Sequence, residues 1–185
     1  MSTLVRAEVV ADILSCTRCE LSSRLVIPVP FRGPTPASVA IIGEAPGRVE
    51  NEVGEPFRGP AGQLLDEALV AAGFDLEELC WVNPVCCWPE RIKTPQPEHF
   101  EACKPHLLAQ LQLINPTYLL LVGNSALYAA GVQTKITATR GKVWQAGDRY
   151  YSATWHPAAV LRDPDKKDQF FSDIKAFREV TTKES

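Results

Sequence analysis

The amino-acid sequence lacks any hydrophobic run that approaches the roughly 20 residues a membrane-spanning helix needs. It has no signal-peptide pattern before its first helix-like stretch, no internal repeat and no low-complexity tract. These absences argue against membrane proteins, secreted proteins and repeat arrays as classes. We expect a protein that works in the cytoplasm and has no membrane partner.

Excess charge of either sign is also lacking, since the formal net charge is −3. This value argues against a protein that coats nucleic acid, although a local basic rim on an acidic protein can still grip DNA. Hydrophobic residues make up 45% and charged residues 22% of the chain, which supplies enough apolar material for a packed core. We expect one domain over residues 1–185, and a monomer.

Short apolar runs alternate along the chain with amphipathic segments. Buried strands are predicted at residues 38–42, 81–85 and 118–122, and a hairpin at residues 142–146 and 149–154. Helices are predicted at residues 2–15 with Ser2 as N-cap, at residues 60–72, at residues 97–114, shortly after Ser125, and around residues 170–177. The alternation predicts a three-layer α/β/α fold around a central, mainly parallel, four-stranded sheet.

Glycine-rich and polar segments follow the predicted strands. Residues 43–47 (Gly-Glu-Ala-Pro-Gly) follow the first strand, Asn83 lies near the end of the second, residues 123–125 follow the third, and His156 follows the last. In a parallel α/β sheet, ligands bind beyond the carboxyl ends of the strands. These four segments therefore predict a single site at one edge of the sheet.

Six cysteines are many for a chain without an export signal, so ligation of a metal or cluster is favoured over disulfides. An N-terminal Cys-x2-Cys pair can present two thiolates to one centre, and two more cysteines bracket a proline-bearing segment. The predicted four-thiolate site consists of Cys16, Cys19, Cys87 and Cys103. We interpret Cys80 and Cys86 as core thiols. The spacing alone does not distinguish zinc from iron–sulfur.

Taken together and in order, these motifs resemble those of the iron–sulfur (family four) uracil-DNA glycosylases, over nearly the whole chain from Cys16 to the final helix. The matching blocks are the Cys-x2-Cys pair, residues 43–47, residues 54–62 (Gly-Glu-Pro-Phe-Arg-Gly-Pro-Ala-Gly), residues 83–89 with Cys103, and residues 156–162 (His-Pro-Ala-Ala-Val-Leu-Arg). The resemblance implies an enzyme that flips uracil out of double- or single-stranded DNA and hydrolyses its N-glycosidic bond. It also implies that the four thiolates hold a structural [4Fe-4S] cluster.

The resemblance implies a role for each pocket residue. Phe57 would stack on the flipped base, and Asn83 would read its edge at O4 and N3–H. His156 would donate, while neutral, to O2 of the departing uracil. The expected substrate-binding backbone consists of Gly43, Glu44 and Ala45. Taken singly, Phe57 could instead be a core residue, and Asn83 could close a turn.

An acid is expected on the opposite side of the sugar, where it would stabilise the developing cation and orient the attacking water. The family carries an acidic run after its first motif, whereas this chain has Arg-Val-Glu-Asn at residues 48–51. Glu50 is therefore the first choice for this catalytic acid and Glu44 the second. Both could instead be solvated loop acids.

The last motif resembles the loop with which the family enters DNA. The implied DNA-binding residues are Pro157, Ala158, Ala159, Val160, Leu161 and Arg162. Val160 or Leu161 would wedge into the vacated base stack, and Arg162 would hold a flanking phosphate or base. Without the resemblance, this segment could be a proline-capped turn that leads into a helix. His99 and His106 lie on a predicted helix and are interpreted as incidental.

Two other functions stay open at this point. The first is a non-catalytic iron–sulfur module of the same fold that binds uracil or single-stranded DNA, which the changes at residues 48–51 favour. The second is a zinc-stabilised enzyme that acts on free nucleosides.

Overall fold

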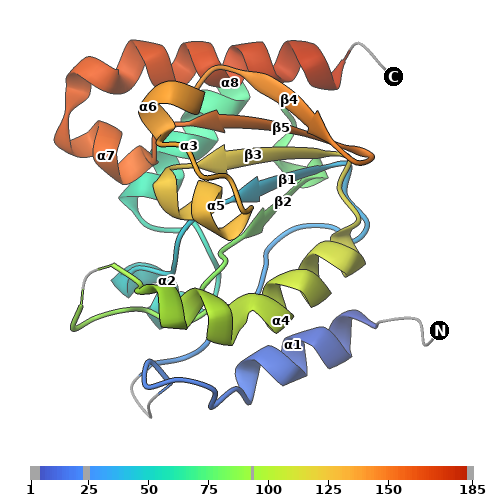
Figure 1. The fold of residues 1–185 in the computed structure, drawn as a ribbon, viewed down its shortest axis with the longest axis vertical. Helices are drawn as coiled ribbons and strands as arrows, with labels where there is room; N and C mark the ends of the chain where they lie inside the picture. The colour runs from blue at the N-terminus through green and yellow to red at the C-terminus, as the bar shows by residue number, and fades with distance from the viewer. Residues whose placement is uncertain (1–4, 23–25, 93, 183–185) are drawn as a thin grey trace.

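A computed structural model describes residues 5–22, 26–92 and 94–182. Its centre is a five-stranded sheet in the order β2-β1-β3-β5-β4 (Figure 1). The strands are β1 (Val39–Ile42), β2 (Leu79–Val82), β3 (Tyr118–Val122), β4 (Val143–Ala146) and β5 (Arg149–Thr154). The neighbours β2, β1, β3 and β5 pair in parallel, and β4 pairs with β5 antiparallel. The mainly parallel α/β fold is confirmed, but the predicted count of four strands is wrong, because both arms of the hairpin join the sheet.

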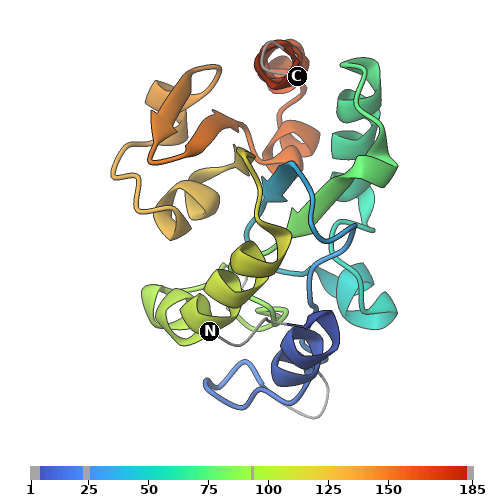
Figure 2. The same ribbon diagram turned by 90° about the vertical axis from the view of Figure 1, so that its right-hand side faces the viewer.

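The helices cover both faces of this sheet. They are α1 (Arg6–Leu14), α2 (Arg48–Val53), α3 (Pro60–Ala71), α4 (Pro97–Ile114), α5 (Asn124–Ala129), α6 (Ile136–Thr139), α7 (Pro157–Arg162) and α8 (Lys167–Thr181), with short 3-10 turns at Leu76–Glu78 and Pro164–Lys166. Figures 1 and 2 show α3 and α8 on one face of the sheet, α4 and α5 on the other, and α1 packed outside α4. None of the helices in the described part of the chain is long and apolar enough to cross a membrane.

The alternation of side chains along the strands builds two apolar cores. On one face, alternate residues of β1 and β3 pack with Ile13, Leu107 and Leu127 of the helices. On the other face, the intervening strand residues pack with Leu65, Leu69 and aromatic residues of α8. Because β1, β2 and β3 are buried along their whole length, they read as continuous apolar runs rather than alternating ones. This explains why the sequence revealed them clearly.

The long elements lie close to where the sequence predicted them, while three details differ. The first helix begins at Arg6, and the predicted cap Ser2 lies outside the described residues. The second strand ends at Val82, which leaves Asn83 to Val85 beyond it. The predicted DNA-entering loop is a helix, α7, with Pro157 at its first position, where proline's fixed φ and missing N–H favour helix initiation.

The carboxyl ends of β1, β2, β3 and β5 meet at one edge of the sheet. In Figure 1 this edge lies on the side of α2, α5 and α7. The segments that follow these four strands therefore come together there, as the sequence predicted for a single site.

Candidate active site at the carboxyl edge of the sheet

A cavity of about 390 Å³ opens at this edge. Its lining comes from residues 44–50, from the turn and helix start at residues 57–62, from residues after β2 and from the start of α7. The predicted site residues that line it are Glu44, Ala45, Glu50, Phe57, Asn83, His156 and Ala158. The structure thus brings together side chains that are up to about a hundred residues apart in the sequence.

Phe57 is held in this wall by its backbone. It is buried, and its φ is +58°, a left-handed conformation that is uncommon for a residue with a side chain. Two glycines make room for it. A Cβ at Gly62 would lie 2.0 Å from the Phe57 carbonyl oxygen, and one at Gly43 would lie 2.4 Å from the ring atom Cζ. The ring position therefore depends on glycine at both places.

Asn83 directly follows β2 and is buried beside the same glycine. A Cβ at Gly43 would come within 2.5 Å of the Asn83 Oδ1 atom. The Gly43 amide donates to the carbonyl of Val82, which extends the β1–β2 pairing up to the cavity. The Asn83 amide and the Phe57 ring thus both pack against Gly43, whose lack of a side chain leaves room for them.

His156 is the N-cap of α7, and this position fixes its tautomer. Its Nδ1 atom accepts a hydrogen bond of 3.1 Å from the Ala158 amide, so the proton of the neutral ring is on Nε2. Burial lowers the pKa of His156; nearby Arg162 lowers it further, while Glu44 acts in the opposite direction. Gly123, with φ +93°, packs against the ring, because a Cβ there would lie 2.8 Å from His156 Cβ. The site therefore presents a neutral imidazole with an N–H donor on Nε2.

Glu44 reaches the cavity from the end of β1. Its carboxylate accepts a hydrogen bond of 2.5 Å from the hydroxyl of Ser125 at the start of α5. Its carbonyl accepts from the amide of Val85, which fixes the backbone on the other side. Ser125 thus holds the carboxylate from a second element. Its contribution could not be inferred from the sequence, because the two residues are 81 positions apart.

Glu50 lies in the cavity wall with both carboxylate oxygens engaged. Oε2 accepts from the Gly47 amide at 3.0 Å, and Oε1 accepts from the amides of Arg58 and Gly59 at 2.9 and 2.7 Å. The first of these contacts is the glutamate half of a capping box at the start of α2, where the N-cap Gly47 has no side chain for the other half, and the other two fix the turn that carries Phe57. These contacts favour a positioning role for Glu50 over a direct role toward water.

Removing the Glu50 carboxylate is expected to loosen the turn that holds Phe57. Glu50→Ala leaves three backbone amides without their acceptor, so we expect the free energy of unfolding to fall by about 1–3 kcal/mol. Thermal or urea unfolding measures this. The matched control is Glu52→Ala on the same helix, whose exposed pair with Arg48 at 3.6 Å should contribute little. Equal stability of the two variants would contradict the positioning role.

The residues of α7 divide between core and surface. Val160 is buried in the core beside α3, whereas Leu161 and Arg162 are exposed. Of the two candidate wedges, only Leu161 projects outward. The segment that was predicted to enter DNA as a loop therefore presents an apolar tip from a helical turn.

The four cysteines predicted as ligands lie near one another. Burial raises the pKa of Cys87 to about 12, and the neighbouring thiols Cys103, Cys19 and Cys16 raise it further, so these side chains face one another. Among the described residues, no three cysteine sulfurs lie within 4.8 Å of one another. Around a single zinc ion, sulfurs 2.3 Å from the metal would be only about 3.8 Å apart. The sulfurs are thus not drawn together as a single zinc ion would hold them, and four thiols are a donor set that an iron–sulfur cluster also uses.

The two remaining cysteines differ from each other. Cys80 is fully buried in β2, and burial raises its pKa to about 12, as expected for a core thiol. Cys86 is also buried, but its thiol and its backbone amide both contact Cys103, and the hydrogen bond from its thiol lowers the pKa of Cys103. Cys86 is thus a core thiol, as interpreted from the sequence, that also contacts one of the four predicted ligands.

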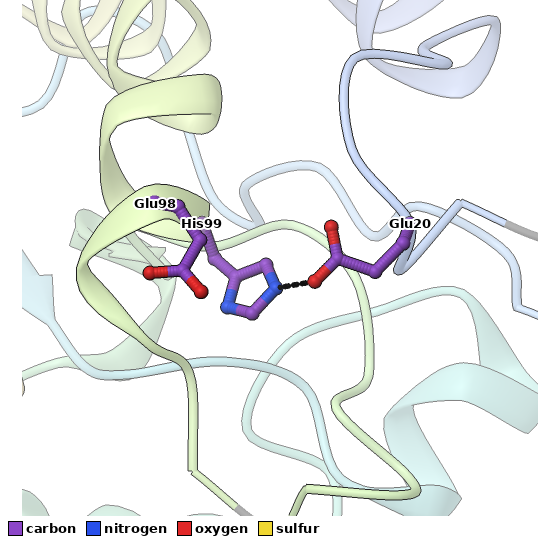
Figure 3. Close-up of side chains that lie close together, drawn as sticks. All are labelled: Glu20, Glu98 and His99. Carbon is purple, nitrogen blue, oxygen red and sulfur yellow. Dashed lines mark hydrogen bonds and ion pairs between the residues drawn. The ribbon is translucent and has the colours of Figure 1, made fainter.

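His99 and His106, interpreted from sequence as incidental, are buried and paired with acids. The His99 Nε2 atom lies 2.6 Å from the Glu20 carboxylate, as Figure 3 shows, while Nδ1 accepts from the Gln96 amide at 2.8 Å. The His106 Nδ1 atom lies 3.1 Å from the Asp12 carboxylate. Both contacts join α4 to the N-terminal segment, and neither histidine lines the cavity.

Several residues of the cavity escaped sequence reasoning. Arg48, Val49, Trp88 and Pro89 line it together with the predicted residues. The signal that could have revealed Trp88 and Pro89 is their position directly after Cys87, because a ligand cysteine fixes its neighbours in space. Asn51 has a structural contact instead, since its Oδ1 atom accepts from the Ile27 amide at 2.9 Å.

Comparison with known proteins gives a consistent result. The model of the uracil DNA glycosylase superfamily matches residues 30–177. A type-4 uracil-DNA glycosylase of Archaeoglobus fulgidus is 35% identical, over 95% of this chain and 93% of the relative. Proteins of the same name from Pyrobaculum aerophilum and Thermotoga maritima are 36% and 35% identical, over 89% and 84% of this chain and 89% and 83% of each relative.

Proposed function

Because this chain belongs to the uracil DNA glycosylase superfamily, we propose that it removes uracil from DNA by hydrolysing the bond between the base and deoxyribose, which leaves an abasic site. The observation that carries this proposal is the single cavity into which Phe57, Asn83 and His156 converge beside the backbone of residues 43–47. A base inside a duplex cannot reach such a cavity, so the nucleotide must swing out of the stack.

Recognition of the base needs a flat face and a matched edge. The ring of Phe57 offers the face, a contact worth roughly 1–3 kcal/mol per base. The amide of Asn83 can donate to O4 and accept from N3–H, a pattern that cytosine would mismatch. The backbone of Gly43, Glu44 and Ala45 borders the remaining edge.

Bond cleavage places negative charge on the departing uracil and positive charge on the sugar. His156 donates from Nε2 to O2 of the uracil, because its Nδ1 atom is occupied by the Ala158 amide. As the bond between N1 and C1′ breaks, its electron pair leaves with the base; water then adds to C1′ and loses one proton, which balances the charge of the uracil anion when neutral uracil is released. A neutral donor is sufficient for a leaving group that is stable as an anion.

Glu44 is the better candidate for the acid that stabilises the sugar cation and orients water. Its carboxylate lines the cavity and is held by one hydroxyl, whereas both oxygens of Glu50 are engaged with backbone amides. This reverses the order in which the two acids were ranked from the sequence. Glu50 acts on the reaction through the position of Phe57.

The pH dependence of kcat/KM is expected to follow protonation of His156. Because burial lowers its pKa, the ring stays neutral through neutral pH, and activity should be lost only as the pH falls well below about 6.5. Arg162→Gln removes a cation that lowers this pKa, so the acid limb should move to higher pH; Glu44→Gln should move it lower. Arg178→Gln, at the opposite end of the strands, is the control. If the acid limb falls at the same pH in all variants, a group other than His156 titrates.

Cys16, Cys19, Cys87 and Cys103 are proposed to hold a [4Fe-4S] cluster. The cluster would supply a structural cross-link between the N-terminal segment, the segment after β2 and helix α4, since hydrolysis of the glycosidic bond needs no electron transfer. What supports this assignment is that Cys103, Cys19 and Cys16 all lie close enough to Cys87 to raise its pKa, while no three cysteine sulfurs of the described residues lie within 4.8 Å of one another, as a single zinc ion would hold them.

Iron content is expected to distinguish the proposed ligand Cys103 from its neighbour Cys86. Cys103→Ser should lower the iron bound per chain and bleach the visible absorbance, because it removes one of four ligands. Cys86→Ser should keep the iron, since Cys86 is proposed to contact a ligand rather than the metal. Metal analysis of the two purified variants measures this. Loss of iron in Cys86→Ser, with retention in Cys103→Ser, would show that Cys86 and not Cys103 is the ligand.

The expected partner is uracil-containing DNA, single- or double-stranded, bound across α7 by a monomer in the cytoplasm. Leu161 is the proposed wedge because it is exposed where Val160 is buried, and Arg162 beside it is free to reach a phosphate. Pro157, Ala158 and Ala159 bring the backbone of the helix start close to the DNA.

A glycosylase assay tests the proposal and its two alternatives. Oligonucleotides with U·G, U·A or single-stranded uracil are incubated with the protein and then treated with alkali, which cleaves abasic sites. Strand scission supports the enzyme; binding without scission would identify a non-catalytic module. Release of uracil from free deoxyuridine by a zinc-containing, iron-free protein would favour the nucleoside enzyme.

A further inference from the structure

Helix α4 carries a stripe of buried polar residues that the proposed reaction does not use. The stripe consists of His99, Cys103, His106 and Gln110, each no more than 3% exposed. The spacing of four, three and four residues places them on one face of the helix. Cys103, a proposed cluster ligand, therefore sits between two buried histidines.

Both histidines bind acids of the N-terminal segment. His99 contacts Glu20, which directly follows Cys19, at 2.6 Å (Figure 3), and His106 contacts Asp12 of α1 at 3.1 Å. The two acids lie on either side of the Cys-x2-Cys pair in the sequence. The pair is thus attached to α4 once before Cys16 and once after Cys19.

A hydrogen bond at the start of α4 determines which nitrogen of His99 carries the proton. The Gln96 amide donates to Nδ1, so Nε2 carries the proton and donates to Glu20. At the far end of the stripe, Gln110 continues the same surface: its Oε1 atom accepts from the Phe31 amide at 2.9 Å, and its Nε2 atom lies 4.0 Å from the sulfur of Cys86. The whole stripe therefore faces the N-terminal part of the chain.

We propose that the Glu20–His99 and Asp12–His106 contacts form a two-point clamp, which holds Cys16 and Cys19 opposite Cys103 and limits the escape of iron from the bound cluster. This inference rests on the proposed cluster assignment. Outer contacts that orient ligands in this way typically change metal affinity by 10- to 100-fold when they are removed. The clamp assigns Glu20, Asp12, His99 and His106 as positioning residues for the cluster.

The two acids allow a test that does not disturb the core, because their side chains are 71% and 61% exposed. In iron-loaded protein, the rate of iron release to a ferrous chelator should rise roughly ten-fold in Glu20→Ala, and further in the double variant with Asp12→Ala. Glu20→Gln keeps an oxygen acceptor for His99 and should release iron close to the wild-type rate. Thermal unfolding of the same samples shows whether the whole fold has weakened.

Glu98→Ala is the matched control. Glu98 is another exposed acid beside the His99 ring, but it precedes His99 on α4 and does not join the helix to the N-terminal segment (Figure 3). Its removal should leave iron release unchanged. Equal release rates in wild type, Glu20→Ala and the double variant would overturn the clamp and leave the cluster assignment intact. Wild-type protein that binds no iron would overturn both.

Discussion

Replacing His156 by alanine is expected to lower kcat/KM on uracil-containing DNA by about 100- to 1,000-fold, the usual effect of removing one donor from a developing anion. The reason lies in the geometry of α7, where the Ala158 amide occupies Nδ1 and leaves Nε2–H as the donor. The loss should appear mainly in kcat, because the charge on uracil O2 develops only in the transition state. Single-turnover cleavage of a U·G duplex measures it.

A binding measurement separates this loss from damage to the site. His156→Ala should retain affinity for DNA that carries a non-hydrolysable uracil analogue, since Phe57 and Asn83 remain in place. It should also lose the acid limb of the pH profile that the wild type shows. Near-normal cleavage by this variant would remove His156 from the proposed reaction.

Replacing Asn83 by alanine is expected to reduce kcat/KM roughly ten- to hundred-fold, in line with about 1–3 kcal/mol for a two-point contact to a base edge. In the proposed reaction this side chain, unlike His156, would contact the base both before and during cleavage, so the effect should appear in binding as well as in kcat. The same single-turnover assay, run over a range of enzyme concentrations, distinguishes the two contributions.

Gly43→Ala tests the same contact from the other side. Its new Cβ would lie 2.5 Å from the Asn83 Oδ1 atom and 2.4 Å from the Phe57 ring, so both must shift. We expect a loss at least as large as that of Asn83→Ala. Gly73→Ala is the control for general destabilisation: its φ of +85° disfavours a side chain although no atom lies within 4 Å of a Cβ placed there, so it should lower stability without lowering the activity of the folded protein. Full activity in Gly43→Ala would contradict the shared geometry.

The fold could be predicted largely from local pattern. Helix α4 and strand β3 lie at the predicted residues, because a long amphipathic period and a continuous apolar run are both strong signals. Both hairpin strands, β4 and β5, also lie close to the predicted residues, but local pattern did not show that both arms join the central sheet, so the strand count was wrong. The alternative interpretation of residues 156–162, a proline-capped turn that leads into a helix, describes the observed α7, because proline at the first helical position favours helix initiation.

From local pattern alone, residues of the candidate site could be predicted only where they follow the end of a strand. Asn83 and His156 follow strands of a parallel sheet, and parallel strands must bring their carboxyl ends together. By contrast, the contacts Ser125–Glu44 and His99–Glu20 join residues 81 and 79 positions apart, with no periodicity to connect them. Roles that depend on such pairs, including the reversed order of Glu44 and Glu50, need three-dimensional coordinates.

The left-handed backbone at Phe57 limits how this pocket can change. Holding a residue in that region costs about 1–3 kcal/mol, and β-branched side chains tolerate it least. An unbranched aromatic side chain therefore tolerates this backbone, whereas isoleucine or valine would displace the turn from its position beside Gly43 and Gly62. A redesign toward other damaged bases is best directed at the edge-reading amide, since the aromatic wall is set by the path of the main chain.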